Sequence, residues 1–239
     1  MNGRRRAGWL PLALAVGACS EPAAPPPTVE VAPPPPPPPP AEPVSEREFE
    51  VHVYVCPDGT RYTVAVGEEA SLLLLPDGAR RLPHRPAASG ARYESEDGTL
   101  YWSKGREALL TIDGVEHAGC LSDATAAVWE SARVRGVDYR AVGTEPGWSL
   151  EIVDGGRGRF ETDDGEQAIE FDTPPPVDGG GPGAIDYVVT GGPRTLRILL
   201  RREPCHDPRA DVAYPLRVRV ETDGRIYEGC GQALGNSAG

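Results

Sequence analysis

Short runs of alternating apolar and polar residues, separated by turn signals, fill the chain from Phe49 to Cys120. Residues 49–56 and 61–66 show the period of two that is typical of half-buried β-strands. Asp-Gly pairs at 58–59, 77–78, 97–98 and 113–114 favour hairpins, because a type I′ turn needs positive φ at both central residues. The predicted strands are 49–56, 61–66, 70–75, 80–82, 91–95, 99–102, 107–112 and 115–120.

Eight short antiparallel strands can close into a small barrel that leaves no exposed sheet edge. In one hairpin we predict Asp97-Gly98 as a two-residue turn, so that paired positions sum to 195. This register places Lys104 opposite Ala91, two residues from Ser89. We therefore expect Ser89 and Lys104 at the same open end of the hairpin, roughly 7 Å apart by strand rise.

The pattern changes at residues 123–135, where Ala-Thr-Ala-Ala-Val-Trp-Glu-Ser-Ala-Arg predicts one short helix with Asp123 as its N-cap. Strand patterns then resume, at 139–144, 148–153, 157–161, 167–171, 185–190, 196–201, 214–221 and 225–230. A Pro/Gly-rich loop at 174–183 is not followed by Gly-Lys-Ser/Thr, so it is not a phosphate-binding loop. The sequence thus predicts an all-β fold, in which a small eight-stranded antiparallel barrel precedes a second β-rich domain.

The N-terminal residues resemble an export signal. Three arginines at 4–6 precede a short apolar stretch, residues 9–18, which is far below the roughly 20 residues that a membrane span needs. Val-Gly-Ala stands directly before Cys19, as in the lipobox of bacterial lipoproteins, whose cysteine is acylated and becomes the mature N-terminus. An ordinary secretory signal that contains Cys19 by chance is the alternative. Because Ser20 and not Asp follows, the usual enterobacterial rule implies an outer-membrane anchor facing the periplasm.

A proline-rich segment follows the cysteine, with an unbroken run at 33–40. Polyproline II rises about 3.1 Å per residue, so a stiff tether of this length reaches up to roughly 80 Å. A proline-rich ligand for a partner is the alternative. The predicted parts are a signal peptide at 1–18, the lipidated cysteine and tether at 19–46, the barrel at 47–122, a helical linker at 123–136, a second β domain at 137–234 and a tail at 235–239.

Export permits disulfides. With Cys19 set aside, four cysteines remain, and four cysteines allow three connectivities. The division into two domains favours Cys56–Cys120 and Cys205–Cys230. In a simple eight-stranded meander the far ends of the first and last strands lie at opposite rims, so the first bond requires barrel shear or shifted strand boundaries.

The formal charge of the chain is −12, and loss of the signal with its three arginines makes it −15. Such an acidic surface argues against nucleic-acid binding and suits a basic protein partner. Lys104 is the only lysine among 24 basic residues. A lone lysine indicates a position that requires a compact ammonium, and chance is the alternative.

An ordered set of motifs between residues 48 and 120 resembles the family of membrane-bound inhibitors of c-type lysozyme (MliC). The matching segments are Tyr54-x-Cys56-x-x-Gly59, Ser89-Gly90-Ala91-Arg92-Tyr93, Trp102-Ser103-Lys104-Gly105 with Ala108, and Cys120. The resemblance implies an eight-stranded barrel that inserts a loop into the active-site cleft of c-type lysozyme. The residues that it assigns to lysozyme binding are Ser89, Gly90, Tyr93 and Lys104. Residues 117–120, His-Ala-Gly-Cys, depart from the tyrosine expected near the end of the motif set.

The implied contacts are those of Ser89 and Lys104 with the catalytic carboxylates. Lysozymes work with a pair of carboxyl groups, so a blocker needs a small hydrogen-bonding group and a cation at the tip of a narrow wedge. A hydroxyl can donate to a carboxylate or accept from a carboxylic acid, and an ammonium can pair with the ionised partner. The alternative is that both motifs are exposed only because turns are exposed. Tyr93 and Trp102 are expected to pack in the core or to support the loops.

Catalysis, a bound metal and a cofactor are not expected. Residues 235–239 match G-x-S-x-G, but no helix follows them, so they do not form a nucleophile elbow. His117 and His206 lie near cysteines without a second ligand pair at zinc-finger spacing.

The second domain resembles a β domain of uncharacterised bacterial lipoproteins, and this resemblance implies no known activity. Glu145, Trp148 and Asp207 are candidates for a binding site there, and the alternative is that Trp148 fills the core and Asp207 caps a turn. Two other functions therefore stay open besides inhibition. One is a non-inhibitory envelope binding or scaffold lipoprotein that acts through the second domain, and the other is an enzyme or metal-binding protein that acts through it.

Overall fold

The structure is a computed structural model that describes residues 49–76, 78–179, 181–190 and 194–235. The predicted signal peptide, Cys19 and the proline-rich tether lie outside the described residues, as does the tail beyond Gly235. Among the described residues, no helix combines the length and the apolar content needed to cross a bilayer.

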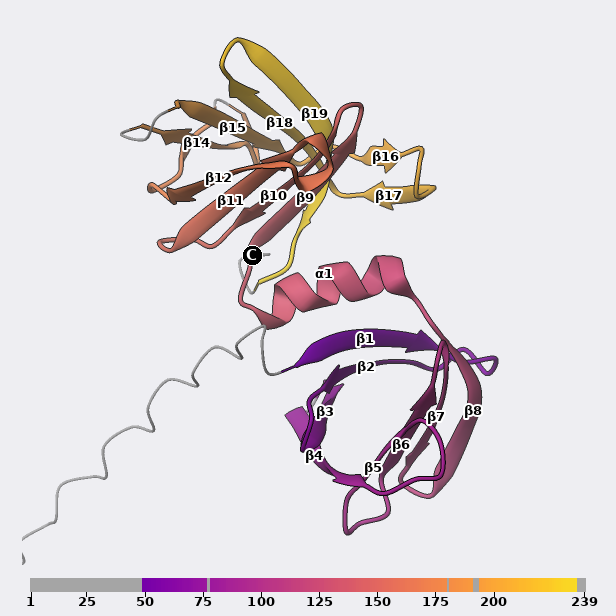
Figure 1. Cartoon of the computed structure of the whole chain (residues 1–239). Helices are drawn as coiled ribbons and strands as arrows, with labels where there is room; N and C mark the ends of the chain where they lie inside the picture. Colours follow the sequence, from indigo (N-terminus) through magenta and orange to yellow (C-terminus); the bar gives the residue numbers. More distant parts are fainter. Residues whose placement is uncertain (1–48, 77, 180, 191–193, 236–239) are drawn as a thin grey trace, which may run out of the picture. The chain divides into compact units, whose positions relative to one another are not determined.

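Residues 50–122 form a closed antiparallel barrel, as the sequence predicts (Figure 1). Its strands are β1 (Glu50–Val55), β2 (Arg61–Val66), β3 (Ala70–Leu75), β4 (Gly78–Arg85), β5 (Ala91–Glu94), β6 (Leu100–Lys104), β7 (Glu107–Ile112) and β8 (Val115–Ser122). Each strand pairs with the next, and β8 pairs with β1. Alternation sends one face of every strand inward, where Tyr54, Tyr62, Tyr93 and Tyr101 pack with Leu73, Leu82 and Leu110.

The barrel closes through a short, strongly offset pairing of β1 with β8. Only Tyr54 with Ser122 and Val55 with Leu121 are paired there. Continuing this register by one residue brings Cys56 opposite Cys120, and the two form a disulfide with a Cα–Cα distance of 3.9 Å. Barrel shear and the extension of β8 to Ser122 thus bring together two cysteines that an unsheared meander keeps at opposite rims.

A β-bulge interrupts β8 just before the disulfide. Ala108 pairs with Cys120 and Leu110 with His117, so β8 has one more residue than β7 over this interval. Gly119 lies within the bulge at φ +69°. The bulge coincides with residues 117–120, where the sequence departs from the motif of the family that it resembles.

Helix α1 (Ala124–Val134) follows the barrel and has the predicted N-cap. The Asp123 carboxylate accepts a hydrogen bond from Ala126 N at 2.9 Å, and Asp123 N donates to the carbonyl oxygen of Val53 in β1. The cap therefore fixes both the start of the helix and its position against the barrel wall.

The remaining residues form a nine-stranded antiparallel sheet and a small hairpin. The sheet has the order β12-β11-β10-β9-β19-β18-β15-β14-β13. Its strands are β9 (Tyr139–Thr144), β10 (Gly147–Ile152), β11 (Arg157–Thr162), β12 (Gln167–Asp172), β13 (Val177–Asp178), β14 (Ile185–Val189), β15 (Leu196–Arg201), β18 (Leu216–Thr222) and β19 (Arg225–Ala233), with a 3₁₀ turn, η1, at Asp163–Gly165. The hairpin joins β16 (Cys205–Asp207) to β17 (Val212–Tyr214).

One face of this sheet carries the second core, which includes Trp148, Leu150, Ile152, Phe160, Tyr187 and Ile198. On the other side, Trp129 of α1 packs with Tyr214 and with the disulfide of Cys205 and Cys230. This is the second disulfide that the domain division favours. Since the two sulfurs are bonded to each other, neither is a thiolate ligand for a metal.

Candidate functional site

The two predicted lysozyme-contacting residues lie at the same rim of the barrel. In an antiparallel meander, the connections β2–β3, β4–β5 and β6–β7 all fall at one end. Ser89 belongs to the β4–β5 loop, residues 86–90, and Lys104 ends β6 at the turn into β7. Both side chains are exposed.

The predicted register of the β5–β6 hairpin is wrong by one residue. Ala91 pairs with Ser103 and Glu94 with Leu100, so paired positions sum to 194 and not 195. The cause is a three-residue loop where a two-residue turn was expected. Ser95 N donates to Thr99 O, Gly98 adopts φ +84°, and Thr99 N donates to the Asp97 carboxylate.

In the observed register, Lys104 lies one residue closer to Ser89 than the prediction placed it. Continued outward from the Ala91–Ser103 pair, the observed register sets Lys104 level with Gly90, next to Ser89. Lys104 itself pairs with Glu107 across the β6–β7 turn, where Gly105 adopts φ +61°. Lys104 therefore stands at the end of the β6–β7 hairpin, and none of the ion pairs among the described residues includes it.

Gly90 is a close-approach position. Its φ is +72°, and a Cβ added to it would lie 2.2 Å from the carbonyl oxygen of Ser103. A side chain at this position would force the loop away from β6. Glycine thus lets the Ser89 segment lie directly against the strand that carries Lys104.

Tyr93 is the predicted binding residue that does not reach the surface. It is 4 % exposed, and its ring stacks on Tyr101 inside the barrel. Its hydroxyl donates to Gly67 O at 2.9 Å, which ties β5 to the β2–β3 loop at the same rim. Burial raises the pKa of the Tyr93 hydroxyl. Tyr93 is therefore a core residue that supports the rim, as its aromatic side chain led us to expect.

Two acidic residues of the same rim were not singled out from the sequence. Glu68 and Glu69 are exposed in the β2–β3 loop, whose position is fixed by the bond from Tyr93 and by His84 N donating to Glu69 O. They could have been found only through the alternating direction of the strands, which assigns their loop to the rim of Ser89 and Lys104.

A polar cluster lies at the opposite rim. His117 Nδ1 is 2.6 Å from Asp58 Oδ2, and Thr60 N donates to Asp58 Oδ1 at 2.8 Å. These contacts lower the pKa of Asp58 to about 2, with the His117 hydrogen bond as the largest cause. His117, considered from the sequence as a metal ligand, thus holds the β1–β2 loop.

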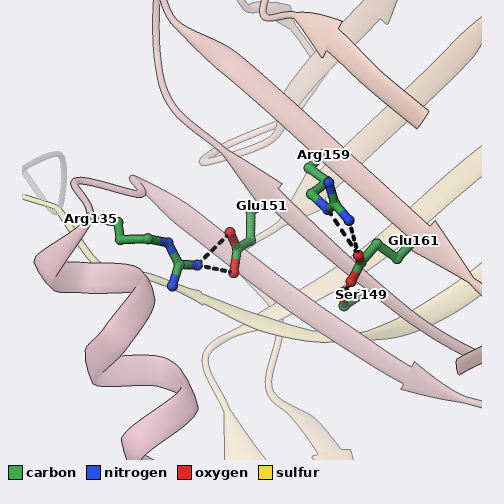
Figure 2. A pocket seen from close by; sticks show the side chains of 5 residues that line it. All are labelled: Arg135, Ser149, Glu151, Arg159 and Glu161. Atoms are coloured by element: carbon green, nitrogen blue, oxygen red, sulfur yellow. Dashed lines mark hydrogen bonds and ion pairs between the residues drawn. The ribbon is translucent and has the colours of Figure 1, made fainter. Parts of the chain in front are cut away.

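A charged pocket of about 370 Å³ lies beside the end of α1 (Figure 2). Its lining residues are Arg135, Ser149, Glu151, Arg159 and Glu161. Arg135 makes two hydrogen bonds to Glu151, at 2.8 and 2.7 Å. Arg159 bonds Glu161, as Figure 2 also shows, and Ser149 donates to the same carboxylate. The charges of the lining side chains therefore balance one another, and the Arg135 pair holds the end of the helix to β10.

The other candidates in the second domain have structural contacts. Trp148 is 5 % exposed, and its Nε1 donates to Glu228 O at 3.3 Å. Asp207 accepts from Arg209 N at 2.9 Å and caps the turn of the β16–β17 hairpin. Glu145 is exposed, at the turn between β9 and β10. The structure does not bring these three residues together in the charged pocket.

The fold and rim define the first domain as a small, disulfide-closed β-barrel that presents a hydroxyl and an ammonium at one end. Residues 54–118 match the family model of the membrane-bound lysozyme-inhibitor of c-type lysozyme, MliC. The resemblance that the motifs predict is thereby confirmed over the matched residues, which are about a quarter of the chain. The match supports a lysozyme-inhibitor role in general terms, and the family's membrane-bound character supports an envelope location. Searches of curated proteins and of solved structures gave no match.

Proposed function

We propose that this protein is a lipid-anchored envelope inhibitor of c-type lysozyme that blocks the catalytic carboxylates with Ser89 and Lys104. The observation that carries the proposal is the neighbouring placement of these two exposed residues at one rim of an MliC-like barrel. The alternative, that both motifs are exposed only because turns are exposed, does not explain why a hydroxyl and the chain's one lysine occupy adjacent register positions.

The chemistry of the target explains why these two groups suffice. One lysozyme carboxyl group is protonated and acts as the acid, while the other is ionised. The Ser89 hydroxyl can hydrogen-bond either form, whereas the Lys104 ammonium gains most from the ionised one. Inside a cleft that excludes water, such a charge-assisted bond is stronger than at an open surface.

The remainder of the chain serves this encounter in the proposal. Acylated Cys19 holds the protein at the outer membrane, and the proline-rich residues 19–46 extend the barrel away from the anchor. The acidic mature chain attracts a basic lysozyme and speeds association. Glu68 and Glu69 place part of this negative charge at the binding rim itself.

The test is a cell-wall lysis assay with c-type lysozyme and the full chain in mild detergent. Ser89→Ala and Lys104→Met are compared singly and together with the wild type. Val115→Ala is the matched control, because Val115 is 55 % exposed at the opposite rim. We expect the wild type and the control to inhibit equally and the double variant to lose at least a hundredfold, since each variant removes a buried polar contact of about 1.5–3 kcal/mol. A folded double variant that inhibits like the wild type excludes this site, and a wild type that inhibits no c-type lysozyme excludes the function.

A second candidate function is the binding of a polar envelope component by the second domain. The observation that favours it is the 370 Å³ pocket, whose lining among the described residues consists of charged and hydroxyl side chains. Ser149→Ala separates the two functions, because it changes the pocket without touching the barrel. Inhibition that is unchanged by this variant shows that the lysozyme activity does not require the Ser149 hydroxyl of the pocket.

A further inference from the structure

Trp102 is an exposed aromatic residue beside the proposed inhibitory residues. Its neighbour in β6, Tyr101, is 1 % exposed and points into the barrel, whereas Trp102 is 39 % exposed on the outer side. A large aromatic ring on the solvent side of a strand gains little from core packing. The hydrogen bond of its indole nitrogen therefore explains the position of Trp102 better than core packing does.

The indole N–H of Trp102 bonds to the loop that carries Ser89. Trp102 Nε1 donates to the carbonyl oxygen of Ser89 at 2.9 Å, across 13 residues of sequence. Among the described residues, Trp102 is the one whose side chain hydrogen-bonds to the 86–90 segment. The bond attaches to the residue that bears the proposed inhibitory hydroxyl.

The backbone of the same segment also approaches β6 closely at Gly90. An added Cβ at Gly90 would lie 2.2 Å from Ser103 O and 3.2 Å from Trp102 Nε1. The loop backbone therefore lies directly on β6, with the indole at its edge. Because Lys104 follows Ser103 in β6, the strand that holds the loop also fixes the ammonium.

We propose that Trp102 is a positioning residue that latches the Ser89 loop onto β6, so that the hydroxyl and the Lys104 ammonium are pre-arranged before lysozyme arrives. Without the latch, the five-residue loop samples other conformations, and binding must select the docked one. The apparent dissociation constant then rises by the inverse of the docked fraction. Loop order in the free protein does not depend on the proposed function, whereas the effect on inhibition rests on it.

The first test measures loop order without lysozyme. Trp102→Phe keeps an aromatic ring and removes the N–H donor. We expect the backbone order parameters of residues 87–90, measured by ¹⁵N relaxation on the full chain in detergent, to fall from about 0.85 to below about 0.6. The order parameters of residues 95–99 at the opposite end of the hairpin serve as the internal control and stay unchanged. Unchanged order at 87–90 in the variant overturns the latch, whether or not the protein inhibits lysozyme.

The second test separates positioning from direct contact with lysozyme. If the latch acts, Trp102→Phe weakens inhibition by roughly five- to tenfold, as expected for loss of one hydrogen bond that holds the docked loop. In the double variant with Ser89→Ala, the fold loss of inhibition is then smaller than the product of the two single losses, because both substitutions act through one loop. If the double variant loses inhibition by the full product of the two single losses, Trp102 contacts lysozyme by itself. This result also overturns the proposal.

Discussion

The close approach of Gly90 to β6 makes a sharp prediction for Gly90→Ala. Alanine at φ +72° costs about 1–2 kcal/mol, because Cβ approaches the backbone in the left-handed region. The new Cβ would also lie 2.2 Å from Ser103 O, about 1 Å inside van der Waals contact. Relief of this clash requires the loop to move, which breaks the bond from Trp102 to Ser89 O and costs about 1 kcal/mol more.

Gly98 offers a matched control in the same hairpin. Its φ is +84°, but nothing lies within 4 Å of an added Cβ. Gly98→Ala should therefore lower the free energy of unfolding by about 1–2 kcal/mol, and Gly90→Ala by about 2–4 kcal/mol. The difference between the two variants isolates the clash and the lost hydrogen bond from the common cost of positive φ.

Urea unfolding and lysozyme inhibition, measured on both variants, check the reasoning. We expect Gly98→Ala to inhibit like the wild type, since its loop is at the far rim, and Gly90→Ala to inhibit at least tenfold less well. Equal loss of stability and equal inhibition in the two variants would refute the close packing of the Ser89 loop against β6.

Three further predictions concern pH, the barrel disulfide and charge. The pKa of Asp58 is lowered to about 2 from the usual 3.8. Its contacts with His117 therefore stabilise the fold above about pH 4, and this stabilisation is lost as the pH falls toward 2. The thermal unfolding temperature should decline less across that window in Asp58→Asn than in the wild type. Replacing both Cys56 and Cys120 by alanine opens a crosslink across a sequence separation of 64 and should lower the free energy of unfolding of the barrel by about 4 kcal/mol, and a loss below about 1 kcal/mol in urea would contradict this. Raising the salt concentration should slow association with a basic lysozyme in stopped-flow measurements, while a salt-insensitive on-rate would count against electrostatic steering.

The strands and the helix were readable from local pattern. The alternation of apolar and polar residues located all eight strands of the barrel, and Asp123 marked the helix start because its carboxylate can satisfy a free backbone N–H. The exposure of Ser89 and Lys104 also followed from their turn motifs. These features depend on interactions between residues close in sequence.

The β5–β6 register shows where local reading failed. Asp97-Gly98 was compatible with a two-residue turn, but the Asp97 side chain bonds Thr99 N and a three-residue loop forms. Both loops satisfy the same sequence signal, and they differ by one residue in the pairing of the flanking strands. The observed register also brings Tyr93 and Tyr101 to the same inner face of the barrel, where their rings stack, and local sequence does not show this packing.

The sequence by itself determined the all-β class, the cysteines available for crosslinking and the two polar groups of the proposed site. Only the tertiary structure decided how these parts meet, through the two-pair closure of β1 on β8, the lie of Gly90 on Ser103 and the bond from Trp102 to Ser89. The physical reason is that strand patterns follow from neighbouring residues, whereas barrel shear and loop docking depend on contacts between distant segments. A one-residue shift in any ladder changes those contacts while leaving every local signal intact.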